Sequence, residues 1–286
     1  MKRGPHPVAF VPSHLIFGSE NSEKTIFLLH GILGSQKNWR GFARKLAERL
    51  PQWCVVTSDL RNHGASRGAA PPHTPAACAK DLARLAEDLG RRPTAIVAHS
   101  FSGKVALIYA REYGHGLRSL FVLDAPPGAR PEGADENAPT AVEALLAAVR
   151  AIRMPVEDRK VVLDALRACG LSRRIVAWMS TNLARRPDGR LEWIFDLEGV
   201  VSMLPPYRRA DLWSVVEHPP ARVSISMIVG GKSDRWAGVE IAHLEDLAQQ
   251  GRIHLDFFED AGHWIHVDAP EKTLDLLVDR LEAGSE

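Results

Sequence analysis

The chain has 286 residues, of which 45% are hydrophobic, and its formal net charge at pH 7 is +1. This length allows one large α/β domain or two small ones, with enough apolar residues for a substantial core. The near-zero charge gives no electrostatic reason to expect a nucleic-acid or acidic-membrane partner.

The cysteines and the N-terminus indicate a reducing compartment. The three cysteines are scattered and have neither a Cys-x-x-Cys nor a metal-ligand spacing; they are Cys54, Cys78 and Cys169. Prolines at positions 5, 7 and 12 interrupt the N-terminus, which makes a poor signal peptide, and no apolar run reaches the length of a transmembrane helix. We therefore expect a cytoplasmic protein without a membrane span, a metal or a cofactor.

The first 128 residues alternate between strand-like and helix-like segments. Apolar, β-rich runs predict strands at residues 14–17, 25–30, 53–58, 94–98 and 120–123. A 3.6-residue apolar period predicts helices at about 38–50, 75–89 and 101–113. This alternation favours a parallel sheet with helices on both faces, whose functional groups gather at the carboxyl ends of the strands. Four polar residues lie at the carboxyl ends of such strands: His30, Asp59, Ser100 and Asp124.

Residues 129–217 break this rhythm. They are arginine-rich and predict helices at 141–152, 157–168 and 172–183, with a β-like patch at 191–197. The alternation then resumes, with strands at 223–229 and 253–258 and helices at 239–249 and 270–283. We interpret residues 129–217 as a helical cap inserted into a core formed by residues 1–128 and 218–286.

The stretch from Thr94 to Lys104 has the pattern of a nucleophile elbow. Ser100 stands between a buried strand and an amphipathic helix, where a tight turn projects its hydroxyl away from the sheet. Ala98 and Ser102 replace the glycines of Gly-x-Ser-x-Gly, but both are small enough for the turn. The alternative is a serine that only caps an ordinary buried helix.

A serine nucleophile needs a base and an acid that orients it. The predicted base is His263, in the loop after the last strand, whereas the nearby His266 is expected to pack or to cap the final helix. Chain order favours Asp234 as the acid, because it follows the strand at 223–229. Asp124 is the alternative acid, unless its carboxylate only caps the turn that follows it.

The oxyanion of an acyl-transfer reaction needs main-chain N–H donors. The predicted donors are the N–H groups of Phe101, directly after the serine, and of Ile32, in the loop after the strand at 25–30. We expect His30 to orient that loop rather than to transfer protons.

Other types of site find little support. Neither a phosphate-binding Gly-x-x-x-x-Gly-Lys-[Ser/Thr] loop nor a Gly-x-Gly-x-x-Gly fingerprint is present. Five arginines of the insertion are interpreted as solvated helix faces, with a clamp for an anionic substrate tail as the alternative. They are Arg173, Arg174, Arg185, Arg186 and Arg190.

Four motifs in this order make the chain resemble the α/β-hydrolase superfamily, in particular small serine esterases and thioesterase-like acyl hydrolases. They lie at residues 29–35 (Leu-His-Gly-x-x-Gly-Ser), 59–66 (Asp-x-Arg-Asn-His-Gly-x-Ser), 98–104 and 261–266 (Ala-Gly-His-Trp-Ile-His). The resemblance implies a mostly parallel eight-stranded sheet with a helical cap. Members of this branch often use the acid that corresponds to Asp124, so the choice between Asp124 and Asp234 stays open.

These features predict a serine hydrolase that cleaves a small-molecule carboxylic ester or thioester through an acyl-enzyme. The alternatives are hydrolysis of a C–C bond or a lactone, perhydrolysis, and a non-catalytic binding protein of the same fold. The oligomeric state is left open. The aromatic residues expected to line the substrate pocket are Phe101, Trp178, Trp193, Phe195 and Trp264.

Overall fold

A seven-stranded sheet forms the centre of the computed structural model, which describes residues 10–130 and 141–283. All neighbouring strands are parallel except the edge strand β1, which is antiparallel to β3. In spatial order the strands are β1 (His14–Gly18), β3 (Trp53–Ser58), β2 (Lys24–Leu29), β4 (Ala95–His99), β5 (Ser119–Leu123), β8 (Ser224–Gly230) and β9 (His254–Phe258).

The seven apolar runs of the sequence are these seven strands, and the predicted mostly parallel sheet is confirmed. The expectation of eight strands was wrong for the described residues. Outside the insertion, this part of the chain carries only seven runs with a β pattern, and the eighth strand came from the resemblance alone.

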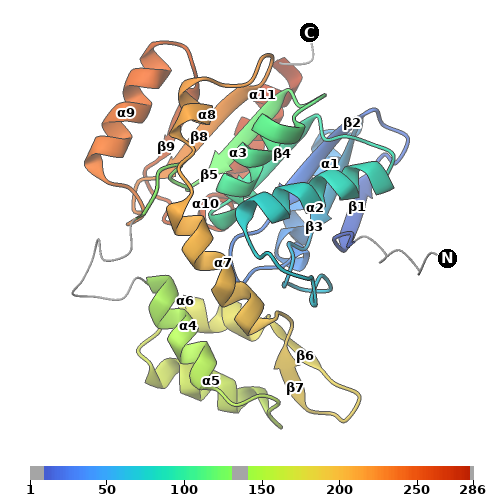
Figure 1. The fold of residues 1–286 in the computed structure, drawn as a ribbon, viewed down its shortest axis with the longest axis vertical. Helices are drawn as coiled ribbons and strands as arrows, with labels where there is room; N and C mark the ends of the chain where they lie inside the picture. The colour runs from blue at the N-terminus through green and yellow to red at the C-terminus, as the bar shows by residue number, and fades with distance from the viewer. Residues whose placement is uncertain (1–9, 131–140, 284–286) are drawn as a thin grey trace, which may run out of the picture.

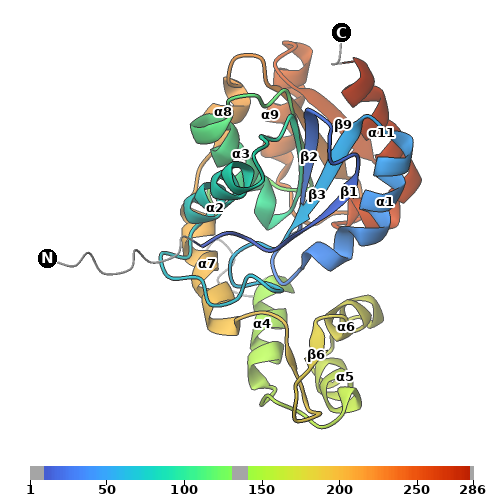
Figure 2. The same cartoon turned by 90° about the vertical axis from the view of Figure 1, so that its right-hand side faces the viewer.

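Alternate residues of the central strands pack against helices on opposite faces of the sheet. In β2, Ile26 and Leu28 contact one apolar cluster and Phe27 and Leu29 the other, and all four are fully buried. Burying one such side chain contributes about 1.5–3 kcal/mol. Figure 2 shows the two helix layers. One layer contains α1 (Arg40–Arg49) and α11 (Pro270–Ala283); the other contains α2 (Pro75–Asp88), α3 (Phe101–Tyr113), α8 (Trp213–Glu217) and α9 (Gly238–Gln249).

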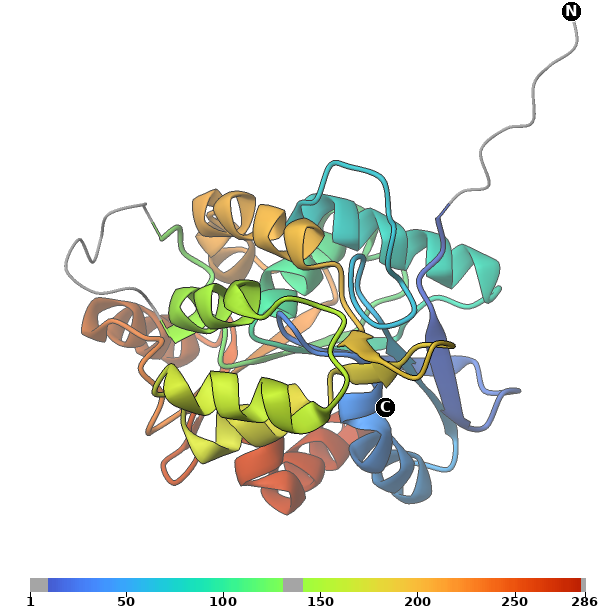
Figure 3. The same ribbon diagram turned by 90° about the horizontal axis from the view of Figure 1, so that it is seen from below.

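A mostly helical segment is inserted between β5 and β8 and has an apolar cluster of its own. We call residues 141–209 the insertion. It lies below the sheet in Figure 1, and Figure 3 looks onto it with the sheet behind. Its elements are α4 (Ala141–Ala151), α5 (Arg159–Ala168), α6 (Arg173–Ser180), β6 (Leu183–Arg185), β7 (Leu191–Trp193) and α7 (Leu197–Arg209). Residues 131–140, which belong to the expected cap, lie outside the described residues.

Helix α7 was not expected, because it contains Pro205 and Pro206, which usually interrupt a helix. It runs from the insertion back to the core (Figure 1). Lys104 of α3 fixes its end, since the buried ammonium donates hydrogen bonds to the carbonyl oxygens of Tyr207 (3.0 Å) and Ala210 (2.7 Å). Burial lowers the pKa of Lys104 to about 8. Within the described ranges, no helix is long and apolar enough to cross a membrane.

Candidate active site

Ser100 occupies a strained turn between β4 and α3. Its φ of 57° and ψ of −121° lie in a region that non-glycine residues rarely adopt, as expected for an elbow that exposes its side chain. The turn needs close backbone approaches. A Cβ atom on Gly31 would lie 3.1 Å from the Cβ of Ser100, and one on Gly103 would lie 2.5 Å from the Cβ of Ala125.

Ser102 replaces a glycine of the elbow without leaving a buried hydroxyl unpaired. Its Oγ donates to the carbonyl oxygen of Leu29 or of His99, each at 3.0 Å. The other replaced glycine, Ala98, is a fully buried strand residue. The tight turn therefore forms without either glycine.

His263 connects Ser100 to a carboxylate. Its Nε2 lies 2.9 Å from the Oγ of Ser100, and its Nδ1 lies 2.7 Å from Oδ2 of Asp124. These partners assign the tautomer: Nδ1–H donates to the carboxylate, and Nε2 accepts from the serine hydroxyl. A proton can thus pass from the hydroxyl to an imidazole that is already oriented.

The carboxylate of Asp124 is fully buried and held by further donors. The main-chain N–H of Gly230 donates to Oδ1 at 3.1 Å, Trp236 Nε1 donates to Oδ1 at 2.8 Å, and Ser233 Oγ donates to Oδ2 at 2.5 Å. With His263 these donors fix the carboxylate in one orientation. Sequence reasoning missed Ser233 and Trp236, since no motif marks a hydroxyl and an indole that act from a neighbouring loop.

The structure does not bring Asp234 to His263, so the acid that chain order favoured is corrected to Asp124. The side chain of Asp234 is 79% exposed, and its nearest ionic partner is Arg235 at 3.4 Å. The cause is local: Ser233 and Trp236, on either side, both turn inward to Asp124. Asp234 is thereby directed outward.

The loop after β2 carries Ile32, one of the expected oxyanion donors, and brings it to the same cavity as Ser100. Its neighbour Leu33 has a φ of 59°, which is strained for a branched residue. Two hydrogen bonds hold Leu33: its N–H donates to Nε2 of His63 at 3.0 Å, and its carbonyl accepts from Nδ2 of Asn182 at 2.8 Å. Asn182 comes from the insertion, and no sequence signal identified it.

His30 uses both ring nitrogens close to the same loop. Nδ1 lies 2.8 Å from the carbonyl oxygen of Gly31, and Nε2 accepts from the N–H of Leu60 at 3.0 Å. Burial lowers the pKa of His30 to about 4 and that of His63 to about 3. Both imidazoles are therefore neutral at pH 7.

Two further histidines lie near the base: the ring of His99 packs against that of His263, and the ring of His266 packs against that of His99. Nε2 of His99 donates to the main-chain oxygen of His263 at 2.8 Å, which fixes the loop of the base. His266, in α10 (Ile265–Asp268), stacks on Trp39 with ring centroids 4.2 Å apart. Burial lowers the pKa of His99 well below its usual value and that of His266 to about 3. Packing is the behaviour that the sequence predicted for His266.

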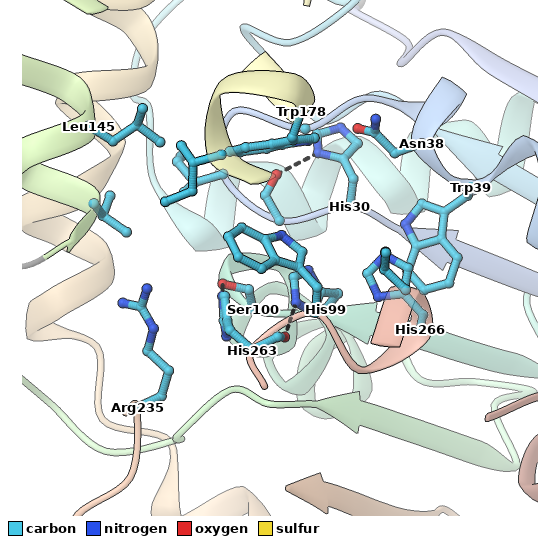
Figure 4. Close-up of a pocket in the computed structure, with 17 residues that line it drawn as sticks. His30, Asn38, Trp39, His99, Ser100, Leu145, Trp178, Arg235, His263 and His266 are labelled. Carbon is cyan, nitrogen blue, oxygen red and sulfur yellow. Dashed lines mark hydrogen bonds between the residues drawn. The ribbon is translucent and has the colours of Figure 1, made fainter. Parts of the chain in front are cut away.

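A cavity of about 170 Å³ lies in front of Ser100, between the sheet and the insertion (Figure 4). Its apolar wall combines residues of α4, α6 and the segment after His263. Those residues are Val142, Leu145, Ile175, Trp178, Trp264 and Val267. Among the described residues, no three histidine, cysteine, aspartate or glutamate side chains gather as metal ligands.

Only two of the five aromatic residues expected in the pocket line this cavity. Trp178 and Trp264 do so, with ring centroids 5.8 Å apart. Phe101, Trp193 and Phe195 do not, and these expectations were wrong. Phe101 is buried and stacks on Tyr207, whereas Trp193 and Phe195 stack on each other, 5.2 Å apart, inside the apolar cluster of the insertion.

Most of the five arginines of the insertion have partners within the protein. Arg174 pairs with Asp268 and covers the ring of Trp264, while Arg186 and Arg190 both pair with Asp188. Arg185 donates to the carbonyl oxygen of Gly189. None of the five lines the cavity in front of Ser100.

The chain is similar in sequence to known hydrolases. A sequence model of the family described as "Alpha/beta hydrolase family" matches residues 26–276. The "sn-1-specific diacylglycerol lipase ABHD11" of Mus musculus is 27% identical over 278 residues, which cover 93% of this chain and 83% of the relative. "Lipase LipV" of Mycobacterium tuberculosis is 27% identical over 266 residues, with 90% and 92% covered.

Solved structures share the fold. The one titled "Marine microorganism esterase" has a TM-score of 0.81 at 21% identity and covers 95% of this chain and 99% of its own. An "E-2-(Acetamidomethylene)succinate Hydrolase" has a TM-score of 0.74 at 20% identity, with 95% of each chain covered. At these identities the likeness concerns the arrangement of the chain.

Proposed function

The chain belongs to the alpha/beta hydrolase family, and we propose that it is a serine hydrolase that cleaves a carboxylic ester or thioester through an acyl-enzyme. One observation carries the proposal: a continuous hydrogen-bonded path from Ser100 through His263 to the buried Asp124. The names of the relatives, a diacylglycerol lipase and a lipase, support an ester as the substrate.

In the first half of the reaction, Ser100 Oγ attacks the acyl carbon while His263 Nε2 accepts its proton. Asp124 holds the imidazole through Nδ1 and stabilises the imidazolium that forms. Its four hydrogen-bond donors keep it in place without reorganisation during the reaction. The imidazolium then gives the proton to the departing alcohol or thiol, and the acyl group stays on Ser100.

In the second half, water attacks the acyl-enzyme and gives its proton to the same imidazole, and Ser100 is regenerated with release of the acid. In both halves the developing oxyanion is stabilised by the N–H groups of Ile32 and Phe101. Ile32 lines the cavity beside Ser100, and Phe101 is the first residue of α3, whose N-terminal N–H groups lack intrahelical partners. One such donor contributes about 3–4 kcal/mol to the transition state.

Helix α8 falls within residues 129–217, the range expected for the cap, but it packs with the core of the sheet. In this proposal the other described residues therefore form the catalytic core, and the cap is the insertion, residues 141–209. Its helices α4 and α6 supply Val142, Leu145, Ile175 and Trp178 to the cavity wall. They exclude water from the bound acyl or leaving group and limit the size of both.

A panel of p-nitrophenyl esters and acyl thioesters of graded length tests the proposal. We expect turnover of at least one ester series, and a loss of about 10⁴-fold or more in kcat for Ser100→Ala. Ser202→Ala, which changes a serine on the exposed side of α7, is the matched control and should retain normal rates. Equal turnover by the wild type and Ser100→Ala would contradict the proposal. Lactones, C–C substrates and peroxide as acyl acceptor, assayed in parallel, distinguish the related chemistries.

A further inference from the structure

Arg235 belongs to the short loop that also holds the acid of the site. Ser233 and Trp236, on its two sides, both donate hydrogen bonds to Asp124. The N–H of Arg235 donates to Ser233 Oγ at 3.3 Å, and its carbonyl oxygen accepts from Nη2 of Arg130 at 2.5 Å. The main chain of Arg235 is therefore fixed relative to the catalytic residues.

The side chain of Arg235 forms part of the wall of the cavity in front of Ser100. Figure 4 shows it entering from the side opposite Trp39 and His266. It is 26% exposed, and its Nε is buried without a hydrogen-bond acceptor among the described residues. Its ionic neighbour there is the outward-facing Asp234, 3.4 Å from Nε, which leaves the rest of the guanidinium free to bind a ligand.

Arg235 brings a permanent positive charge to a cavity that is otherwise apolar or neutral. Three histidines of the wall, His30, His99 and His266, are held neutral by burial, which lowers the pKa of each. No carboxylate belongs to the described wall of the cavity. Asp234, which is 79% exposed, approaches this partly desolvated guanidinium on its Nε side without a hydrogen bond. A ligand that supplies a hydrogen-bonded anion to the Nη groups would offset the remaining cost of desolvation.

We propose that Arg235 selects substrates that carry a carboxylate in addition to the ester, such as monoesters of small dicarboxylic acids. A guanidinium binds a carboxylate through two parallel hydrogen bonds, which fix its orientation as well as its charge. Hydrolysis then releases an alcohol and a dicarboxylate by the steps given above. The substrate class rests on the proposed function; the anion site itself does not.

Two isosteric esters test the selection. Monoethyl glutarate carries the carboxylate, and ethyl glutaramate carries a neutral amide of the same shape. We expect the wild type to favour the carboxylate by about tenfold or more in kcat/KM, which corresponds to about 1.4 kcal/mol. Arg235→Gln should bring the ratio of the two values close to one, and Arg235→Lys should give an intermediate ratio.

Arg44→Gln is the matched control: Arg44 is an exposed residue of α1 that does not line the cavity, and its replacement makes the same change in charge. It should keep the wild-type ratio. A wild type that does not prefer the carboxylate, or an Arg235→Gln variant that keeps the preference, would overturn the proposal. Replacing monoethyl glutarate by the butanoyl ester of glycolate shows whether the carboxylate is bound on the acyl or the alcohol side.

Binding without turnover separates this proposal from the proposed function. Calorimetric titration of monoethyl glutarate into Ser100→Ala should give saturable binding that is lost, or weakened by about tenfold or more, in Ser100→Ala/Arg235→Gln. If no ester is hydrolysed but this difference is found, the anion site stands and the proposed reaction fails. If esters are hydrolysed and the difference is missing, the anion site is wrong.

Discussion

Asn182 donates a hydrogen bond from Nδ2 to the main-chain carbonyl of Leu33, 2.8 Å away, across 149 positions of the chain. It joins the start of β6 in the insertion to the loop that follows β2. Asn182 is fully buried, and the N–H of Leu33 is held from the other side by His63. The strained Leu33, and with it the adjacent N–H of Ile32, is thus fixed by both halves of the molecule.

Removing this bond should impair the chemical step. Asn182→Leu keeps a similar volume but leaves the buried carbonyl of Leu33 without its donor, at a cost of about 1–3 kcal/mol. If Ile32 stabilises the oxyanion, kcat should fall by about tenfold or more, with a smaller change in KM, because the oxyanion develops in the transition state and is absent from the bound substrate. Steady-state kinetics on the best ester of the panel measures both.

Thr181→Ala is the matched control for Asn182→Leu, because Thr181 is exposed and bonds only within its own turn of the insertion. It should leave both constants within about twofold. An Asn182→Leu variant with the kcat of the control would show that the insertion does not position this loop.

Substitution of each candidate acid by asparagine tests which of the two orients His263. Asp124→Asn keeps the geometry but offers His263 an amide instead of a carboxylate, which costs about 10⁴-fold in kcat in the serine protease triad. We expect a loss of several orders of magnitude here. Asp234→Asn changes a side chain that is 79% exposed and should leave kcat within about twofold. The reverse order of the two rates would reinstate Asp234.

The strands, and the polar residues at their ends, could be predicted because each depends on a local pattern. Residues 25–30 and 53–58 are nearly continuous apolar runs, and the turn at Ser100 follows from small residues within a few positions. The acid could not be predicted in this way. Its identity depends on where the side chains of Ser233 and Trp236 point, and their partner Asp124 lies more than 100 positions earlier.

The remaining errors have a similar origin. Helix α7 was not predicted because its sequence contains Pro205 and Pro206. The helix forms despite these prolines, since it packs against the apolar clusters of both the core and the insertion. Trp193 and Phe195 were expected in the pocket because they are aromatic and lie in the predicted cap. The direction in which an aromatic side chain points depends on how the insertion folds. The rings of Trp193 and Phe195 stack on each other within the apolar cluster of the insertion.

Lys104 should be essential for the stability of the junction between α3 and α7. In Lys104→Met, three carbonyl oxygens lose their common donor: those of Gly128, Tyr207 and Ala210. We expect the free energy of unfolding to fall by about 2–5 kcal/mol. Urea unfolding measures this loss. Lys80→Met, on the exposed side of α2, should change it by less than about 0.5 kcal/mol. Equal stability of the two variants would contradict the role of Lys104.

The buried histidines predict sensitivity to acid. His30, His63 and His266 have folded-state pKa values of about 4, 3 and 3, below the value of about 6.5 in the unfolded chain. At a pH between the folded-state and unfolded-state pKa values, the unfolded state binds more protons than the folded state. The free energy of unfolding therefore falls as the pH is lowered from 7 towards 4. Each histidine contributes up to about 1.4 kcal/mol per pH unit.

Comparison of the wild type with His63→Gln isolates one of these contributions. Burial raises the pKa of Asp59, which acts in the opposite sense, but this residue is present in both proteins. Urea unfolding at pH 7, 6 and 5 should give a shallower pH dependence for His63→Gln, by the contribution of one histidine. Identical slopes, or histidine NMR signals of the wild type that all titrate near pH 6.5, would show that these rings are not held neutral.

The central claim is that Ser100 is an activated nucleophile, and labelling by a fluorophosphonate probe tests it most directly. Mass spectrometry of the folded wild type should find one adduct, on Ser100. The adduct should be absent in Ser100→Ala, strongly slowed in His263→Gln and retained in Ser202→Ala. A folded wild-type protein without an adduct on Ser100, or with the same labelling rate in His263→Gln, would contradict the account.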